Sequence, residues 1–140
     1  LNWLKEKYHL ENNFKIIKGD SGNLSRYFKR NEIHAVATEP DLGPYYRKMP
    51  NREEINKVIK ILENLYFDFF LELRHVMKKN GKVAIVLPRL KYKNGYRDVS
   101  INKIISQTGF RLFSADKRIK LPIVSEGRFL DRMIYVFESA

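Results

Sequence analysis

The residues of this chain that could do chemistry begin with Glu39, which follows the apolar run Ile33–Ala37 after a single threonine. An apolar run that leads into an acid and a proline predicts a buried parallel strand that stops at the rim of a sheet. Open α/β sheets place their ligand sites at the carboxyl ends of such strands. Because Pro40 and Pro44 stiffen the loop that follows, we expect Glu39 to be held at a functional site.

Glu39 has no neighbouring His, Cys or second acid at the spacing of a metal site or a hydrolase, and His9, His34 and His75 are scattered along the chain. The sequence therefore predicts no metal site. A single acceptor is enough to hold an amino group so that its nitrogen lone pair faces an electrophile. The alternative is that Glu39 only caps the helix after the strand.

Basic residues mixed with tyrosines form a second candidate site, which comprises Arg89, Lys91, Tyr92, Lys93, Tyr96 and Arg97. This composition is typical of a contact with single-stranded RNA, and the alternative is a solvated loop. A second basic group comprises Lys117, Arg118, Lys120, Arg128 and Arg132. The formal net charge of +11 favours a polyanionic partner, although a lysine-rich composition bias would give the same charge.

The periodicity of the chain predicts the elements that position these residues. Asn51 with two acids in the first turn begins a long helix, which Lys78–Gly81 ends. The other expected helices lie at Leu1–Leu10, which has no helix start signal before it, at Leu24–Phe28 and at Ser100–Thr108. The expected strands lie at Phe14–Lys18, at Ile33–Ala37 and at Lys82–Leu87, where Pro88 marks the end of the strand. Two final strands at Phe110–Ala115 and Met133–Glu138 are joined by a long basic loop.

Alternating strands and helices predict one α/β domain over residues 1–140, a three-layer sandwich with a mainly parallel sheet. The sequence contains no apolar run of about 18 residues and no signal segment, so we expect a soluble, cytoplasmic protein with no membrane partner. It also contains no cysteine, which excludes disulfides and Cys-ligated metals.

The segment Thr38-Glu39-Pro40-Asp41-Leu42-Gly43-Pro44 resembles the catalytic loop of Rossmann-fold, S-adenosylmethionine-dependent methyltransferases that modify exocyclic amino groups of nucleobases. The resemblance is greatest to the tRNA guanosine methyltransferase branch and its RNA methylase relatives. It implies catalytic roles for Glu39 and Pro40, a cofactor contact at Thr38, and substrate contacts at Asp41 and Leu42. The last two residues replace the usual proline and aromatic of the family.

The same resemblance implies that Gly19, Asp20 and Ser21 bind the adenine end of S-adenosylmethionine, although a plain Asx turn explains the same residues. Tyr45 and Tyr46 would stack on a flipped base in place of the missing aromatic, and core packing is the alternative.

The family sheet has the strand order 3-2-1-4-5-7-6 with its final strand antiparallel, and this chain matches about the carboxy-terminal two-thirds of that catalytic domain. The glycine-rich cofactor loop has no counterpart. We therefore expect a fragment, a half of a split enzyme, or a chain whose missing strands come from a disordered segment or a second copy. The expected function is methylation of RNA, with tRNA guanine as the target. A non-catalytic nucleic-acid-binding module and a DNA amino-methyltransferase are the alternatives.

Overall fold

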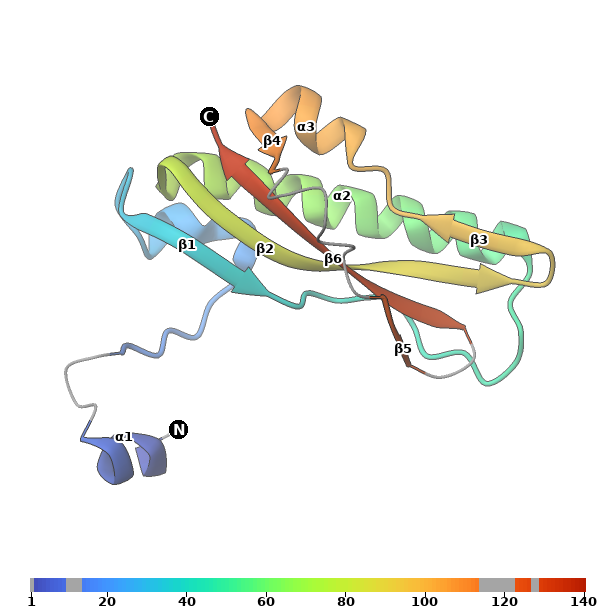
Figure 1. The fold of residues 1–140 in the computed structure, drawn as a ribbon, viewed down its shortest axis with the longest axis horizontal. Coiled ribbons are helices and arrows are strands. Elements are labelled where there is room, and N and C mark those ends of the chain that lie inside the picture. The colour runs from blue at the N-terminus through green and yellow to red at the C-terminus, as the bar shows by residue number, and fades with distance from the viewer. Residues whose placement is uncertain (1, 10–13, 114–122, 127–128) are drawn as a thin grey trace.

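The computed structural model describes residues 2–9, 14–113, 123–126 and 129–140 (Figure 1). In chain order the elements are α1 (Asn2–Tyr8), the 3₁₀ helix η1 (Ser21–Arg26), β1 (Ile33–Thr38), α2 (Arg52–Val76), β2 (Met77–Tyr92), β3 (Gly95–Asp98), α3 (Asn102–Thr108), β4 (Phe110–Leu112), β5 (Ile123–Glu126) and β6 (Leu130–Ser139). Both η1 and α3 contact α2, which covers one face of the sheet. The described residues thus form two layers rather than the expected three.

The described strands form one mixed sheet with the order β1-β2-β6-β4, in which β3 also pairs with β2 and β5 with β6. This order reproduces the 4-5-7-6 portion of the expected sheet. Only β1 and β2 pair in parallel, however, and the other pairs are antiparallel. The expected mainly parallel sheet was therefore wrong, because no further parallel strand lies beside β1 in the described residues and the unexpected strands β3 and β5 add antiparallel pairs.

Residues 14–20 have no regular secondary structure, so the predicted strand at Phe14–Lys18 was wrong. A single strand gains its backbone hydrogen bonds only from a neighbour, and no described strand lies beside this segment. Strand β1, which was predicted to be buried, also has no described strand beside it on one edge. Its residues alternate between half-buried and exposed, and Ala35 and Ala37 are exposed.

Helix α2 begins at the predicted cap. The Asn51 side chain accepts a hydrogen bond from the Glu54 amide at 2.9 Å, and the Glu54 carboxylate accepts one from the Asn51 amide at 2.8 Å. This capping box satisfies two backbone donors that a helix start leaves unpaired. The helix ends at Val76, and Asn80 takes the left-handed conformation in the segment where the β1–β2 register shifts. None of the helices in the described ranges could span a bilayer.

Strand β2 is longer than the predicted Lys82–Leu87 and continues through Pro88. On this edge of β2, pairing with β1 ends at Ile85 and pairing with β3 begins at Arg89. Pro88 therefore lies between the two ladders, where its missing N–H removes no hydrogen bond on that edge. The predicted helix at Ser100–Thr108 is confirmed as α3, after which Gly109 takes the left-handed conformation.

The core lies between α2 and the sheet and is rich in aromatic residues. The ring of Phe70 packs edge-on against Phe110 of β4 and Phe137 of β6, both at 5.0 Å between centroids, and against Phe69 at 5.8 Å. Such edge-to-face contacts add to the gain from burying the rings themselves. One helix residue thus joins two strands from the carboxy-terminal part of the chain.

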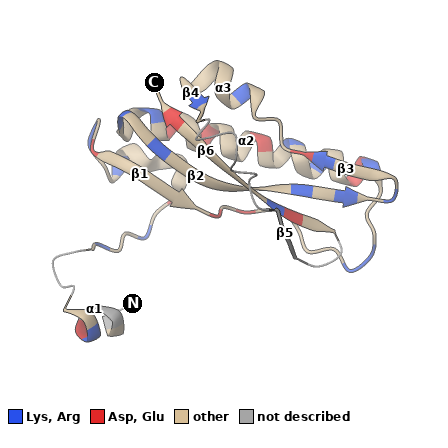
Figure 2. Ribbon diagram, in the orientation of Figure 1, with Lys and Arg blue, Asp and Glu red and all other residues tan. Residues whose placement is uncertain are grey.

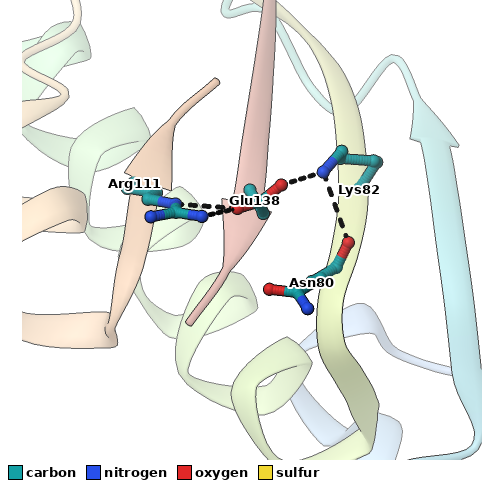
Figure 3. Close-up of polar contacts among 4 residues, drawn as sticks. All are labelled: Asn80, Lys82, Arg111 and Glu138. Carbon is teal, nitrogen blue, oxygen red and sulfur yellow. Dashed lines mark hydrogen bonds and ion pairs between the residues drawn. The ribbon is translucent and has the colours of Figure 1, made fainter. Parts of the chain in front are cut away.

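The other face of the sheet carries an ion cluster that links three strands (Figure 3). Glu138 of β6, 5% exposed, pairs with Lys82 of β2 and Arg111 of β4. Arg111 Nε donates to Glu138 Oε1 at 2.7 Å, and Lys82 Nζ also donates to the Asn80 carbonyl at 3.4 Å. A buried carboxylate is tolerated when cations and hydrogen bonds satisfy it, so this cluster compensates the charge of Glu138 on a face that no described helix covers.

We expect Phe70→Ala to lower the free energy of unfolding by about 3–5 kcal/mol, because it removes a fully buried ring and leaves a cavity. Denaturant unfolding followed by circular dichroism measures this change. The matched control is Ile61→Ala on the same helix, whose residue is 67% exposed and should change the value by less than about 0.5 kcal/mol. Equal losses in the two variants would contradict this assignment of the helix faces.

Candidate functional site

Glu39 follows the last residue of β1, Thr38, and its carboxylate is held by Arg132 of β6. Arg132 donates to Glu39 Oε1 from Nη2 at 2.7 Å and from Nε at 3.1 Å. Oε2 of Glu39 has no hydrogen-bond partner among the described residues. Because the Glu39 side chain remains 45% exposed, one carboxylate oxygen is fixed in position while the other remains accessible.

The loop after Glu39 is fastened to α2. The Tyr66 hydroxyl donates to the Asp41 carbonyl, and the Asp41 side chain accepts a hydrogen bond from the Gly43 amide at 2.8 Å. Burial and the nearby Asp41 carboxylate raise the pKa of Tyr66, so its hydroxyl stays a donor at neutral pH. Gly43 has φ +100°, and a Cβ there would lie 3.1 Å from Val58 Cγ1. The loop conformation therefore depends on a glycine at this position.

The other residues of this loop differ in exposure. Pro40 and Leu42 are half-buried. Tyr45 is 91% exposed, which leaves its ring available for stacking. Tyr46 instead packs against the hydrophobic core, and burial together with Glu54 raises its pKa. The core-packing alternative thus describes Tyr46, whereas Tyr45 is compatible with the stacking role.

Gly19, Asp20 and Ser21 form the entrance to η1. Asp20 is the N-cap of η1, and its Oδ1 accepts a hydrogen bond from the Gly22 amide at 2.8 Å. This is the Asx-type contact that was the alternative for Asp20. A Cβ at Gly19 would lie 2.5 Å from the Tyr27 ring, so a larger residue at this position would displace that ring. Asp20 remains exposed, and its Oδ2 makes no hydrogen bond with the described residues.

The basic segment expected to be a loop is a β-hairpin, in which Lys91 pairs with Tyr96 and Tyr92 with Gly95 (Figure 2). Lys93 and Asn94 make its turn. Lys91 Nζ lies 5.7 Å from the centre of the Tyr96 ring, which is 53% exposed. The hairpin thus presents a cation beside an aromatic ring. Lys-Asn-Gly between alternating residues was the sequence signal for this turn.

Two residues of the predicted RNA contact also make contacts within the chain. Arg89 donates from Nε to Asp98 Oδ1 at 2.7 Å and from Nη2 to Asp98 Oδ2 at 3.1 Å. The hydrogen bonds with Asp98 raise the pKa of Arg89. Tyr92 packs against the hydrophobic core. Lys91, Lys93, Tyr96 and Arg97 remain as candidates for contact with a nucleic acid.

Sequence reasoning missed the contacts that hold these candidates. Arg132 was grouped with other cations as a basic patch, yet it orients Glu39 from 93 positions away in the chain. The remaining members of that patch, Lys117, Arg118, Lys120 and Arg128, lie outside the described residues. Tyr66 was not identified from the sequence as a contact of the Glu39 loop. No local pattern could indicate either contact, because each depends on the tertiary arrangement. Among the described residues, no group of three His, Asp or Glu side chains could hold a metal ion.

Comparison with solved structures shows what this arrangement resembles. TrmN from Thermus thermophilus matches 99% of this chain with a TM-score of 0.58 and 18% identity. A proposed DNA modification methylase, also from Thermus thermophilus, matches 86% with a TM-score of 0.54 and 15% identity. The fold thus resembles part of a methyltransferase fold. No protein-family model and no curated protein sequence matches the chain.

The matched region is only part of each similar structure. This chain spans 32% of TrmN and 52% of the methylase. At such low identity the likeness shows the fold alone. The likeness relates the arrangement of helices and strands to those structures and assigns no activity to any residue.

We expect Gly43→Ala to lower the free energy of unfolding by about 1–3 kcal/mol, because alanine at φ +100° is strained and its Cβ meets Val58. Denaturant unfolding provides the measurement. Gly22→Ala is the control, since a Cβ there would meet only Asp20 at 3.4 Å or beyond. If Gly43→Ala cost no more than Gly22→Ala, the loop would not be tied to α2 as described.

Proposed function

We propose that this chain supplies the target-amine side of an S-adenosylmethionine-dependent methyltransferase that acts on nucleic acid, with guanine in tRNA as the preferred target. The observation that carries the proposal is the position of Glu39 at the carboxyl end of a parallel strand, with Arg132 holding one carboxylate oxygen. The partial methyltransferase fold supports the reaction class.

In this proposal Glu39 Oε2 accepts a hydrogen bond from the exocyclic amino group of the base. Arg132 holds Oε1 of the carboxylate, and the Tyr66–Asp41 contact holds the loop that carries Glu39. Holding the amine in one orientation aims the nitrogen lone pair and removes the entropic cost of alignment in the transition state. With Arg132 bound to Oε1, Oε2 is the carboxylate oxygen left to accept a hydrogen bond from the substrate.

The residues at the η1 entrance fit the adenine end of the cofactor. Asp20 Oδ1 is used by the Gly22 amide, while the exposed Oδ2 can accept a hydrogen bond from an amino group such as that of adenine. Gly19 and Ser21 would lie beside it, and Thr38 ends the strand before Glu39. The cofactor would supply a methyl group activated by a positively charged sulfur.

The hairpin at Lys91, Lys93, Tyr96 and Arg97 would contact the nucleic acid outside the reacting base. Lysine side chains neutralise phosphates and release counterions, and an exposed tyrosine beside a cation provides a stacking surface. Tyr45, exposed next to the Glu39 loop, would stack on the extruded base.

The alternative is a nucleic-acid-binding module of methyltransferase descent without catalysis. The Glu39–Arg132 ion pair favours it, because the pair compensates the charge of Glu39 without any substrate. Titration calorimetry with S-adenosylhomocysteine separates the two functions. Binding supports the enzyme. If neither this chain nor a longer form with the glycine-rich cofactor loop binds it, the proposed enzyme is excluded.

We expect Glu39→Gln to reduce turnover on the order of ten- to a thousandfold, within the range for one positioned catalytic group. The amide keeps an acceptor oxygen but loses the charge, and the contact matters mainly in the transition state, so nucleic-acid affinity should change little. The rate is measured with the glycine-rich cofactor loop present in cis or in trans.

The matched control is Glu53→Gln on the first turn of α2, whose side chain is 79% exposed and forms a surface ion pair with Lys57 at 3.0 Å. It should leave turnover unchanged. Normal turnover in Glu39→Gln with a reduced free energy of unfolding would assign Glu39 a structural role only.

Replacing both Lys91 and Lys93 with Ala should reduce the slope of the logarithm of the RNA-binding constant against the logarithm of salt concentration by about 1.4. Each phosphate contact on a single strand contributes roughly 0.7 to this slope. Fluorescence anisotropy with a short labelled single-stranded RNA over a range of salt concentrations gives the slope. An unchanged slope would show that these lysines are solvated and lie outside the RNA contact.

A further inference from the structure

An open cleft of about 1100 Å³ lies at the end of β1 opposite Glu39. Its walls come from the segment before η1, from η1 and the turn after it, and from the last turn of α2. Glu32, which lines the cleft, precedes β1, whereas Glu39 follows it, so the length of the strand, roughly 20 Å at 3.3 Å per residue, separates the two regions. The proposed methyl transfer uses no residue of this cleft.

The cleft is rich in cations. Lys15, Arg26, Lys29 and Arg30 line it, and each of them is exposed. None of these four side chains forms an ion pair within 4.0 Å with a described residue. Four cations gathered around one concave surface create a positive potential that concentrates anions.

The two acids of the cleft are already used by backbone and hydroxyl donors. Glu72 Oε2 accepts hydrogen bonds from the Ser25 amide at 2.9 Å and from the Ser25 hydroxyl at 2.8 Å. These bonds lower the pKa of Glu72. Glu32 Oε2 accepts a hydrogen bond from the Lys29 amide. The carboxylates therefore fasten the loops around the cleft rather than pair with its lysines.

The wall that carries Lys29 and Arg30 is anchored to the end of α2. The Asn31 amide donates to the His75 carbonyl at 3.4 Å, and the Glu32 amide donates to the Val76 carbonyl at 2.8 Å. These bonds satisfy carbonyls that a helix end otherwise leaves unpaired. The backbone beneath the cations is thus fixed before any ligand arrives, which lowers the entropic cost of binding.

We propose that this cleft binds phosphoryl groups of a nucleic-acid backbone, as an anchoring site separate from the Glu39 region. The exposed Tyr27, at the rim of the cleft, offers a ring on which a base can stack beside the bound phosphates. An open cleft of this volume suits an extended polyanion better than a small enclosed ligand.

The test is the salt dependence of binding of a short labelled single-stranded RNA by this chain. Lys29→Ala combined with Arg30→Ala should reduce the log–log slope by about 1.4, while both backbone amides that fasten the wall remain. The control changes Lys57 and Lys60 on the exposed side of α2 to Ala, which removes the same charge and should leave the slope unchanged. Thermal unfolding of each variant verifies that it folds.

Equal slopes for the cleft variant and the control would overturn the inference. If the hairpin variant at Lys91 and Lys93 loses slope while the cleft variant does not, this inference alone fails. If the cleft variant loses slope and the hairpin variant does not, the cleft inference stands and the proposed role of the hairpin fails.

Amide chemical shifts identify the source of the bound phosphate. RNA should shift the amide signals of residues 26–30 in the parent chain but not in the cleft variant. Shifts produced by inorganic phosphate alone, with no response to RNA, would assign a small-anion site and exclude the nucleic-acid backbone. A loss of stability in the cleft variant without a change of slope would show that the cations only complement the carbonyl end of α2.

Discussion

The packing of α2 across one face of the sheet is the interaction on which the rest of this structure depends. The single residue Phe70 contacts both β4 and β6, and the Tyr66 hydroxyl, from the same helix, binds the loop after β1. The helix therefore determines both where the strands lie and how the Glu39 loop is held. A one-residue insertion within the helix would rotate the apolar residues that follow it by about 100° away from the core.

Charged residues have two separable functions in this chain. Some act as tertiary ties between distant strands, as Glu138 does with its two cations and Arg132 with Glu39. Others, such as Lys91 and the lysines of the basic cleft, remain in solvent without an acidic partner in the described residues. The cations that give the chain its positive net charge therefore differ in role, since some are paired within the fold and others are available to a ligand. Two groups of cations without an ion pair among the described residues lie at the hairpin and at the cleft, toward opposite ends of α2.

The sequence predicted those features that depend on local chemistry. Asn51 and Glu54 indicated the start of α2, Gly109 the end of α3, and the apolar run before Glu39 the strand β1. It failed where neighbours decide the outcome: Phe14–Lys18 has the composition of a strand but no partner strand in the described part of the chain. Contacts such as Arg132 with Glu39 could not be predicted, because residues so far apart in sequence meet only after the sheet forms.

Because β2 is long, its two ends differ in how easily they unfold locally. Residues 82–85 have β1 on one side and β6 on the other, whereas Tyr92, at the end of the hairpin, pairs with β3 alone among the described strands. The central amides can be exposed only by breaking most of the sheet, while the hairpin end can separate at a small cost in free energy. One continuous strand therefore spans a range of local stabilities, rigid beside the strand that leads to Glu39 and yielding where the basic hairpin meets solvent.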